Sequence, residues 1–315
     1  MTELLGDIAW VTDGGLETDL LFNKGIDLPE FAAFPLVEDS HLVEVLEAYY
    51  ADYAAIAAAV GAGLVLETPT WRANPDWAAL LGYDAARLEA VNHRAVELMR
   101  TVADKADVSS SLISGVVGPR GDGYVAAGGH LDESAEYHSA QVRAFAAAGV
   151  DFVHAMTISD PAEALGVIRA ARAAGVPVAV SFTVETDGRL PDGSTLRDAV
   201  LEVDASEPPD WYGVNCAHPL HVLPALDRPD VDGDAGGPRD ASWSARIAAF
   251  RPNASTLSHD ELDEMSELDA GDLALLTGST DRVRDLLPGL RVVGGCCGTD
   301  VSHVAALWGT TPAAR

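Results

Sequence analysis

Lysine is almost absent from this chain of 315 residues, in which Lys24 and Lys105 are the only lysines. The whole chain has 20 basic residues against 49 acidic ones, and its formal net charge is −29. A surface this acidic repels nucleic-acid phosphates and anionic lipid. The basic residues are mostly scattered arginines without a basic patch. We therefore expect neither nucleic acid nor a membrane surface as a partner.

Long apolar runs and abundant cysteine are missing as well. No stretch approaches the roughly 18 uncharged residues that a membrane helix needs. The opening MTELLGDIAW lacks the basic start and apolar core of a signal peptide, so a cytoplasmic location is expected. An odd number of cysteines, three, argues against structural disulfides and favours metal or thiol chemistry.

The chain does have ample material for a packed core, because 48% of its residues are hydrophobic. This composition excludes a disordered chain or a disulfide scaffold. Short apolar, β-branched runs alternate with Ala-rich helical patterns along the sequence. Strands are predicted at 8–12, 63–67, 112–117, 151–156, 176–182, 211–215, 247–250 and 290–294. Helices are predicted at 42–60, 85–106, 134–148, 162–174 and 196–203.

Eight strand-then-helix units predict an α/β fold, a (β/α)8 TIM barrel. A doubly wound open sheet is the alternative that the same alternation permits, and the strand count and length favour the barrel. No linker divides the chain, so residues 1–315 are expected to form a single domain. The Asp-, Gly- and Pro-rich stretch 227–240 is interpreted as a loop insertion between the sixth and seventh strands.

All three cysteines follow predicted strands. Cys216 ends the sequence GVNC after the sixth strand, and Cys296 and Cys297 lie in GGCCGT after the eighth. The carboxyl ends of barrel strands share one face, where active sites are built. Three thiolates could therefore converge on one zinc ion, provided that the backbone turns sharply at Cys296 and Cys297. The flanking glycines permit such a turn.

Two other interpretations of these residues remain open on spacing alone. The cysteines could be inert, with Cys216 a small buried hydrophobe. Alternatively, Gly294 and Gly295 could form the phosphate-binding loop that often follows late barrel strands. No CxxC pair or zinc-finger spacing is present to decide the matter.

The motifs GVNC, GGCCGTDVSH and TDGGLETDL, taken together, resemble the zinc-dependent homocysteine S-methyltransferase family. The likeness runs in order from Asp13 to His303. It implies a (β/α)8 barrel that transfers a methyl group from a sulfonium or quaternary ammonium donor to the homocysteine thiol, giving methionine. It also implies a homo-oligomer, without fixing the number of subunits.

The resemblance also implies roles for particular residues. Cys216, Cys296 and Cys297 match the zinc ligands, and Asp13 matches the carboxylate that receives the substrate's amino group. The predicted substrate-binding residues are Asp13, Gly14, Gly15, Glu17, Glu67, Thr68 and Asn215. For Gly14, Gly15 and Glu17 the alternative is a tight turn. For Glu67, Thr68 and Asn215 a purely structural role is equally compatible with the sequence.

One departure from the family pattern concerns the acceptor. Where the family usually has a glutamate after the fourth strand to pair with the homocysteine ammonium, this chain has Met156. Loss of one carboxylate partner should weaken ammonium binding by roughly 1–3 kcal/mol. Glu17 is a candidate to compensate for that loss. The alternatives are a different thiol or selenol acceptor, or a non-catalytic zinc-binding barrel.

The sequence leaves the methyl donor open. Trp71, Trp77, Tyr83 and Trp211 lie near predicted strand ends or in loops, where aromatic faces could hold a methyl-bearing cation. A phosphate-binding aldolase or isomerase on the same barrel is disfavoured, because the two lysines are poorly placed for a Schiff base or a phosphate cradle.

Overall fold

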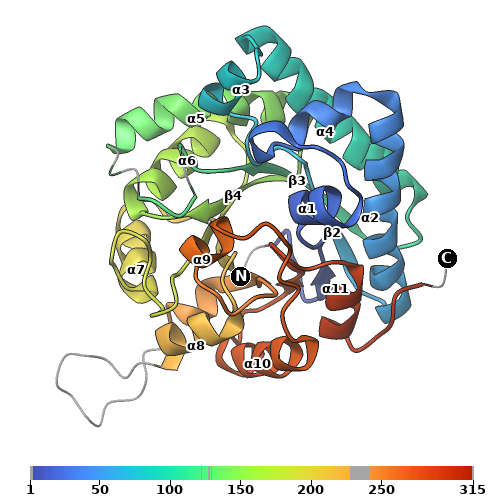
Figure 1. The fold of residues 1–315 in the computed structure, drawn as a ribbon. Helices are drawn as coiled ribbons and strands as arrows, with labels where there is room; N and C mark the ends of the chain where they lie inside the picture. The colour runs from blue at the N-terminus through green and yellow to red at the C-terminus, as the bar shows by residue number, and fades with distance from the viewer. Residues whose placement is uncertain (1–2, 122, 127, 129, 228–241, 314–315) are drawn as a thin grey trace.

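The computed structural model describes residues 3–121, 123–126, 128, 130–227 and 242–313, and in them eight parallel strands close into a barrel in chain order. Pairing of Trp10 with Val292 joins the first and last strands. Closure excludes the open doubly wound sheet and confirms the predicted (β/α)8 barrel, which Figure 1 shows. The strands are β1 Trp10–Val11, β2 Gly63–Glu67, β3 Ser111–Val117, β4 Phe152–Ile158, β5 Val178–Phe182, β6 Trp211–Asn215, β7 Ile247–Arg251 and β8 Val292–Val293.

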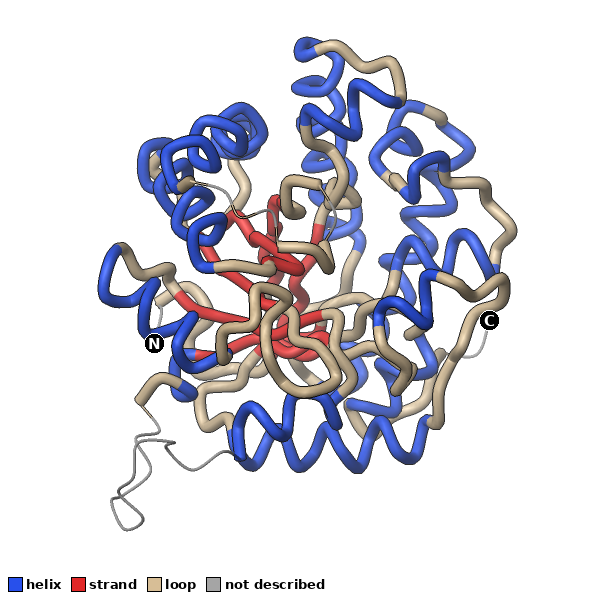
Figure 2. The backbone as a smooth tube through the Cα atoms, turned by 60° about the vertical axis from the view of Figure 1, so that its left-hand side comes forward, coloured by secondary structure: helices blue, strands red, loops and turns tan. Residues whose placement is uncertain are grey.

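Helices surround this barrel on its outside, as the tube in Figure 2 shows. The longer ones are α2 Ser40–Val60, α4 Ala85–Lys105, α5 Leu131–Ala148, α6 Pro161–Ala174, α7 Leu196–Ser206, α8 Pro219–Asp227 and α10 Leu273–Leu286. Shorter helices are α1 Leu16–Thr18, α3 Pro75–Leu80, α9 His259–Asp263 and α11 Val301–Leu307. Several short helical turns, such as the π-helical turn Asp19–Asn23, lie in the loops between these elements.

The sequence marks where the helices begin and end. The side chain of Asp39 accepts hydrogen bonds from the backbone at the start of α2, and those of Asp84 and Asp160 do the same for α4 and α6. Helices α2 and α6 end at Gly61 and Gly175 in the left-handed conformation that glycine tolerates. All five predicted helices form, each within a few residues of its predicted bounds.

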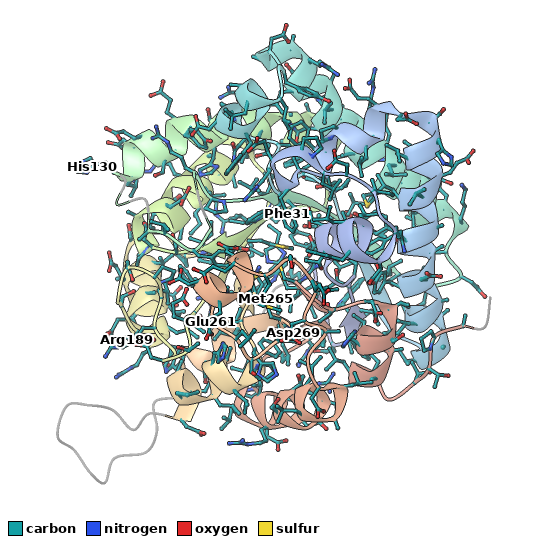
Figure 3. All side chains as sticks on the ribbon, in the orientation of Figure 1. Phe31, His130, Arg189, Glu261, Met265 and Asp269 are labelled. Atoms are coloured by element: carbon teal, nitrogen blue, oxygen red, sulfur yellow. The ribbon has the colours of Figure 1, made fainter. Side chains whose placement is uncertain are left out.

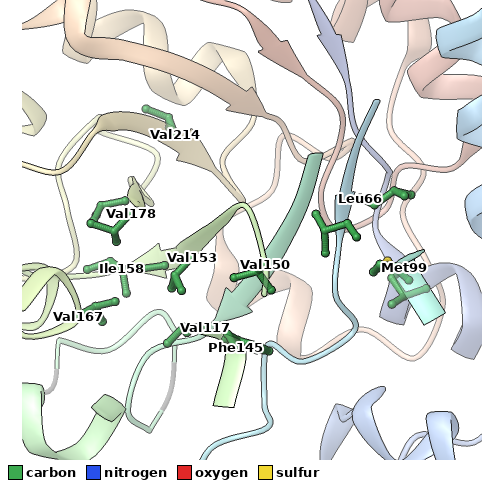
Figure 4. Packing of buried hydrophobic residues seen from close by; sticks show 14 of the residues in the cluster. Leu66, Met99, Val117, Phe145, Val150, Val153, Ile158, Val167, Val178 and Val214 are labelled. Carbon is green, nitrogen blue, oxygen red and sulfur yellow. The ribbon is translucent and has the colours of Figure 1, made fainter. Parts of the chain in front are cut away.

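Two apolar layers hold the barrel together. Val153, Val178 and Val214 point outward from the strands and pack under the helices, with Val167 of α6 and Phe145 of α5, as Figure 4 shows. A second cluster fills the barrel interior at the end away from the strand carboxyl termini: Leu5, Trp10, Val65, Leu112, Phe152, Ala179, Trp211, Ala248, Ala249 and Val292. This plug leaves only the opposite end of the barrel open for a site.

The first and last strands are shorter than predicted. Residues 8–12 and 290–294 each contribute only two residues to the sheet. Ile8 is 41% exposed, so the apolar run begins before the strand does. Most of the predicted insertion 227–240 lies outside the described residues. Among the described residues, no helix is long and apolar enough to span a membrane.

Candidate metal centre and substrate cavity

The three cysteines meet at the carboxyl end of the barrel, as their positions after β6 and β8 predict. The sulfur of Cys216 lies 3.0 Å from that of Cys296 and 3.5 Å from that of Cys297. All three sulfurs lie within 4.8 Å of one another. Cys216 is buried and the other two are half-buried. Such a cluster is the donor set of a thiolate metal site.

The backbone near the cysteines is specialised in two ways. Cys216 has a φ of 58°, a left-handed conformation that non-glycine residues rarely adopt. Beside Cys296, a Cβ at Gly15 would lie 2.4 Å from the Cys296 carbonyl oxygen, and one at Gly295 would lie 2.1 Å from Thr299 Oγ1. These glycines therefore serve close packing, since neither has a positive φ.

Hydrogen bonds among the three thiols shift their pKa values in different directions. Hydrogen bonds with Cys216 and Cys297 lower the pKa of Cys296, and the nearby Arg251 guanidinium lowers it further. The same hydrogen bonding raises the pKa of Cys297.

Asp13, the predicted ammonium partner, lies beside the cysteines but is already paired. Arg251 Nη2 lies 2.7 Å from Asp13 Oδ1, and the Tyr49 hydroxyl donates to Asp13 Oδ2 at 3.2 Å. Burial raises the Asp13 pKa to about 6, although Arg251 opposes the shift. Sequence reasoning missed Arg251 because the predicted seventh strand stops one residue before it.

Arg251 also ties the two shortest strands together. Its guanidinium donates to the carbonyl oxygens of Gly14, after β1, and Gly295, after β8. A further contact joins it to Glu67, at 3.5 Å. The Arg251 guanidinium therefore links the segments after the first and last strands, β1 and β8, at the end of the barrel where the site lies.

Glu67 belongs to a buried polar chain below the cavity. Its Oε1 lies 3.1 Å from Nδ1 of His154, whose Nε2 lies 2.7 Å from the Ser181 hydroxyl. Burial disfavours the Glu67 carboxylate, but His154 and Arg251 hold its pKa below the ordinary value. Glu67 lines the cavity, whereas His154 and Ser181 do not, so these two residues lie out of reach of a substrate in the cavity.

Glu17 is the acidic side chain of the cavity floor that lacks a partner. It is half-buried, and among the described residues no other side chain forms a hydrogen bond or an ion pair with it. Burial raises its pKa to about 7; its own backbone N–H opposes the shift, and the charges of Cys296 and Asp13 add to it. The nearby Arg72 guanidinium also opposes the shift, and a cation in the cavity would approach a carboxylate that forms no ion pair within the described residues.

Hydrogen bonds join the ends of β4 and β6 near Met156. Asn215 accepts a hydrogen bond from the Thr157 backbone and donates to the Thr157 hydroxyl, both at 2.8 Å. Its amide also lies 3.8 Å from Cys296 Sγ. Thr68, the remaining predicted residue, bonds to the Val116 backbone. Both predicted residues line the cavity, but their hydrogen bonds are structural.

A cavity of about 380 Å³ opens above the cysteines. All ten predicted site residues line it. Met156, Tyr124, His259 and the aromatic side chains of Phe22, Phe31 and Trp71 complete much of its wall. Figure 3 labels Phe31, Met265 and Asp269, which also line it. Of the four aromatic residues considered for donor binding, only Trp71 lines the cavity, whereas Trp211 lies in the interior plug.

Comparisons with known proteins place this chain in a family. The family model described as homocysteine S-methyltransferase matches residues 10–310. The chain is 27% identical to homocysteine S-methyltransferase of Escherichia coli strain K12, over 94% of this chain and 93% of that protein. It is 26% identical to betaine–homocysteine S-methyltransferase 1 of Bos taurus, over 77% of this chain and 59% of that protein.

A solved structure extends the likeness to three dimensions. The metallated form of the homocysteine methyltransferase MmuM from Escherichia coli superimposes with a TM-score of 0.69, at 23% identity, over 96% of both chains. At this identity the match supports the fold alone. The family model covers nearly the whole chain and includes all three cysteines, and on that basis the protein belongs to the homocysteine S-methyltransferase family.

Proposed function

We propose that this protein is a zinc-dependent homocysteine S-methyltransferase, which moves a methyl group from a cationic donor to the homocysteine thiol and forms methionine. The observation that carries the proposal is the group of three cysteine sulfurs within 4.8 Å of one another at the floor of a cavity. Family membership and the names of both curated relatives support the same activity.

The donor set suits zinc. Cys216, Cys296 and Cys297 would hold the ion with soft thiolates, and a site with three protein ligands is typical of catalytic rather than structural zinc. A zinc ion held there would supply the Lewis acidity that lowers the pKa of the acceptor thiol. The side chains around the cavity have the tasks of holding both substrates in line and excluding water.

The acceptor's amino and carboxylate groups would meet the loop after β1. Gly14 and Gly15 bring the backbone to the cavity floor, with Asp13 and Glu17 on either side of them. Since Arg251 already neutralises Asp13, we assign most of the charge recognition of the ammonium to Glu17. Glu67, Thr68 and Asn215 shape the floor and keep the strand ends in place.

The donor would lie toward the open end of the cavity. Phe31 and Trp71 offer aromatic faces, which attract sulfonium and quaternary ammonium groups. A cavity of about 380 Å³ must hold both substrates, which favours a small donor such as S-methylmethionine or betaine over S-adenosylmethionine.

A second acceptor class is favoured by two observations. Met156 is apolar where an acidic residue would pair with an ammonium, and the Asp13 carboxylate is engaged with Arg251. A thiol or selenol without a nearby amino group would fit such a pocket. No observation favours a non-catalytic barrel, because the cavity and the cysteine cluster are both present.

The deciding experiment combines metal analysis with a substrate panel. The purified protein should contain about one zinc per chain and should methylate homocysteine from at least one of S-methylmethionine, betaine and S-adenosylmethionine. A preference for amino-free thiols would show that homocysteine is not the natural acceptor, while methyl transfer to a thiol would still be supported. Absence of transfer from every donor to every thiol would refute the enzyme.

Three further expectations remain proposals. We propose a single domain spanning residues 1–315, a homo-oligomer, and a cytoplasmic location with small molecules as the only substrates. A surface with a net charge of −29 supports the expectation that nucleic acid and membranes are not partners.

A further inference from the structure

His259, the first residue of the short helix α9, packs directly against Cys216. Its Nε2 lies 2.6 Å from the Cys216 carbonyl oxygen, and its Nδ1 lies 2.8 Å from Glu185 Oε1. His259 is buried, with 6% of its surface exposed. A backbone carbonyl only accepts hydrogen bonds, so Nε2 must carry a proton. The Glu185 carboxylate, in turn, fixes the plane of the ring from the other side.

The Cys216 carbonyl is held by more than one side chain. Besides His259, the Asn253 amide donates to it at 3.1 Å and the Thr183 hydroxyl at 3.3 Å. These three donors come from the segments after β5 and β7, on the two sides of β6. They converge on the one cysteine whose φ is left-handed, at 58°. Unusual backbone conformations of this kind persist when surrounding contacts over-determine them.

The same imidazole ring also positions a neighbour of the Cys216 thiol. It stacks on the Tyr124 ring, with centroids 3.8 Å apart and an interplanar angle of 19°. The Tyr124 hydroxyl lies 3.0 Å from Cys216 Sγ. His259 therefore contacts the backbone of Cys216 and the side chain that hydrogen-bonds with its sulfur.

We propose that the Glu185–His259 pair is a positioning device for Cys216, which sets the direction of its thiol toward Cys296 and Cys297 without itself binding the metal. Glu185 orients the ring, the ring holds the strained Cys216 backbone, and the ring face orders Tyr124 beside the sulfur. The proposal rests on the proposed metal centre. Partners that orient metal ligands in this way typically contribute 10–100-fold to metal affinity.

Cobalt(II) provides the test, because cobalt–thiolate absorption reports on ligand geometry independently of activity. We would titrate cobalt into the wild-type protein and the variants His259→Ala and Glu185→Ala. The matched control is His303→Ala. His303 also lies between a carboxylate, Asp300 at 2.7 Å, and a backbone carbonyl, that of Ala270 at 3.0 Å, but on α11 away from Cys216.

The expected result is a cobalt affinity about 10–100-fold weaker in His259→Ala, with altered thiolate bands. Glu185→Ala should show a smaller change in the same direction, and His303→Ala should match the wild type. Circular dichroism would verify that each variant folds. If His259→Ala does not fold, the proposal is tested with Glu185→Ala, which changes a less buried residue. Wild-type affinity and bands in the folded variants would overturn the positioning role alone. A wild-type protein without cobalt–thiolate bands would instead refute the metal centre, and the inference with it.

Discussion

The carboxylate of Asp13 and the guanidinium of Arg251 form a buried ion pair, 2.7 Å apart, at the floor of the cavity. Asp13 and Glu67 both raise the pKa of Arg251, against the effect of its burial, so the cation is permanent. A substrate ammonium that approaches Asp13 must therefore share this carboxylate with an arginine. This arrangement makes the recognition of the acceptor the most informative property to measure.

The first prediction concerns that shared carboxylate. Asp13→Asn should raise the KM for homocysteine by less than about tenfold, equivalent to less than ~1.4 kcal/mol, because the ammonium loses the weaker of its two charged partners and keeps Glu17. Zinc content should not change, since Asp13 is not a ligand. An unchanged KM, measured by steady-state kinetics, would assign the ammonium to another group.

The same ion pair also predicts an effect on stability. Arg251→Met removes the cation and leaves the Asp13 carboxylate buried without it, so it should lower the free energy of unfolding by about 3–5 kcal/mol.

The second prediction concerns the metal. Cys216→Ala and Cys297→Ala should each lose most of the zinc, because removal of one of three protein ligands weakens the site strongly. The melting temperature should remain close to that of the metal-free wild type, since the apolar core carries the stability of a barrel this large. Elemental analysis decides the point, and full zinc retention by both variants would contradict it.

The third prediction uses Met156, which lines the cavity and is 6% exposed. Met156→Glu should lower the KM for homocysteine relative to amino-free thiols, because it restores a carboxylate near the ammonium. Met156→Gln has the same size without the charge and serves as the control. If the natural acceptor lacks an ammonium, Met156→Glu should instead impair the native reaction through an unpaired buried charge. A competition assay with both kinds of thiol separates the two results.

The fourth prediction concerns pH. Burial raises the Glu17 pKa to about 7, above its ordinary value of 4.5, so the folded state holds this proton more tightly than the unfolded state. Stability should therefore fall as the pH rises from about 4.5 through 7. Glu17→Gln removes this loss and should stabilise the protein at pH 8 by on the order of 1 kcal/mol, with little effect at pH 4.

Denaturant titrations at both pH values would check the Glu17 effect. Glu97→Gln, at an exposed position of α4, is the matched control and should show no such dependence. Equal effects of the two substitutions would show that the stabilisation is a property of the overall negative charge and not of the cavity.

The fifth prediction concerns assembly. Light scattering should find a homo-oligomer, and lower salt should weaken it, because subunits with a net charge of −29 repel one another more strongly when screening is reduced. A monomer at all usable concentrations and salt levels would contradict this expectation.

The periodicity and motifs of the sequence were sufficient to predict the barrel fold and the meeting of its three cysteines. Strand and helix patterns are local properties, and all eight predicted strands form. Because the carboxyl ends of parallel barrel strands share one face, the positions of Cys216 and of Cys296–Cys297 after the sixth and eighth strands already implied their meeting, 80 residues apart in the chain. The GVNC and GGCCGT motifs indicated the family to which the chain belongs.

The contacts that surround this cluster followed from barrel closure and side-chain direction. Arg251 looks in sequence like a charged residue at the end of an apolar strand, yet its guanidinium reaches Gly14, 237 residues away, across the β1–β8 seam. His259 follows a loop, and nothing local indicates that it returns to a carbonyl 43 residues earlier. Such pairings depend on which residues the closed barrel brings together, and local propensity carries no information about them.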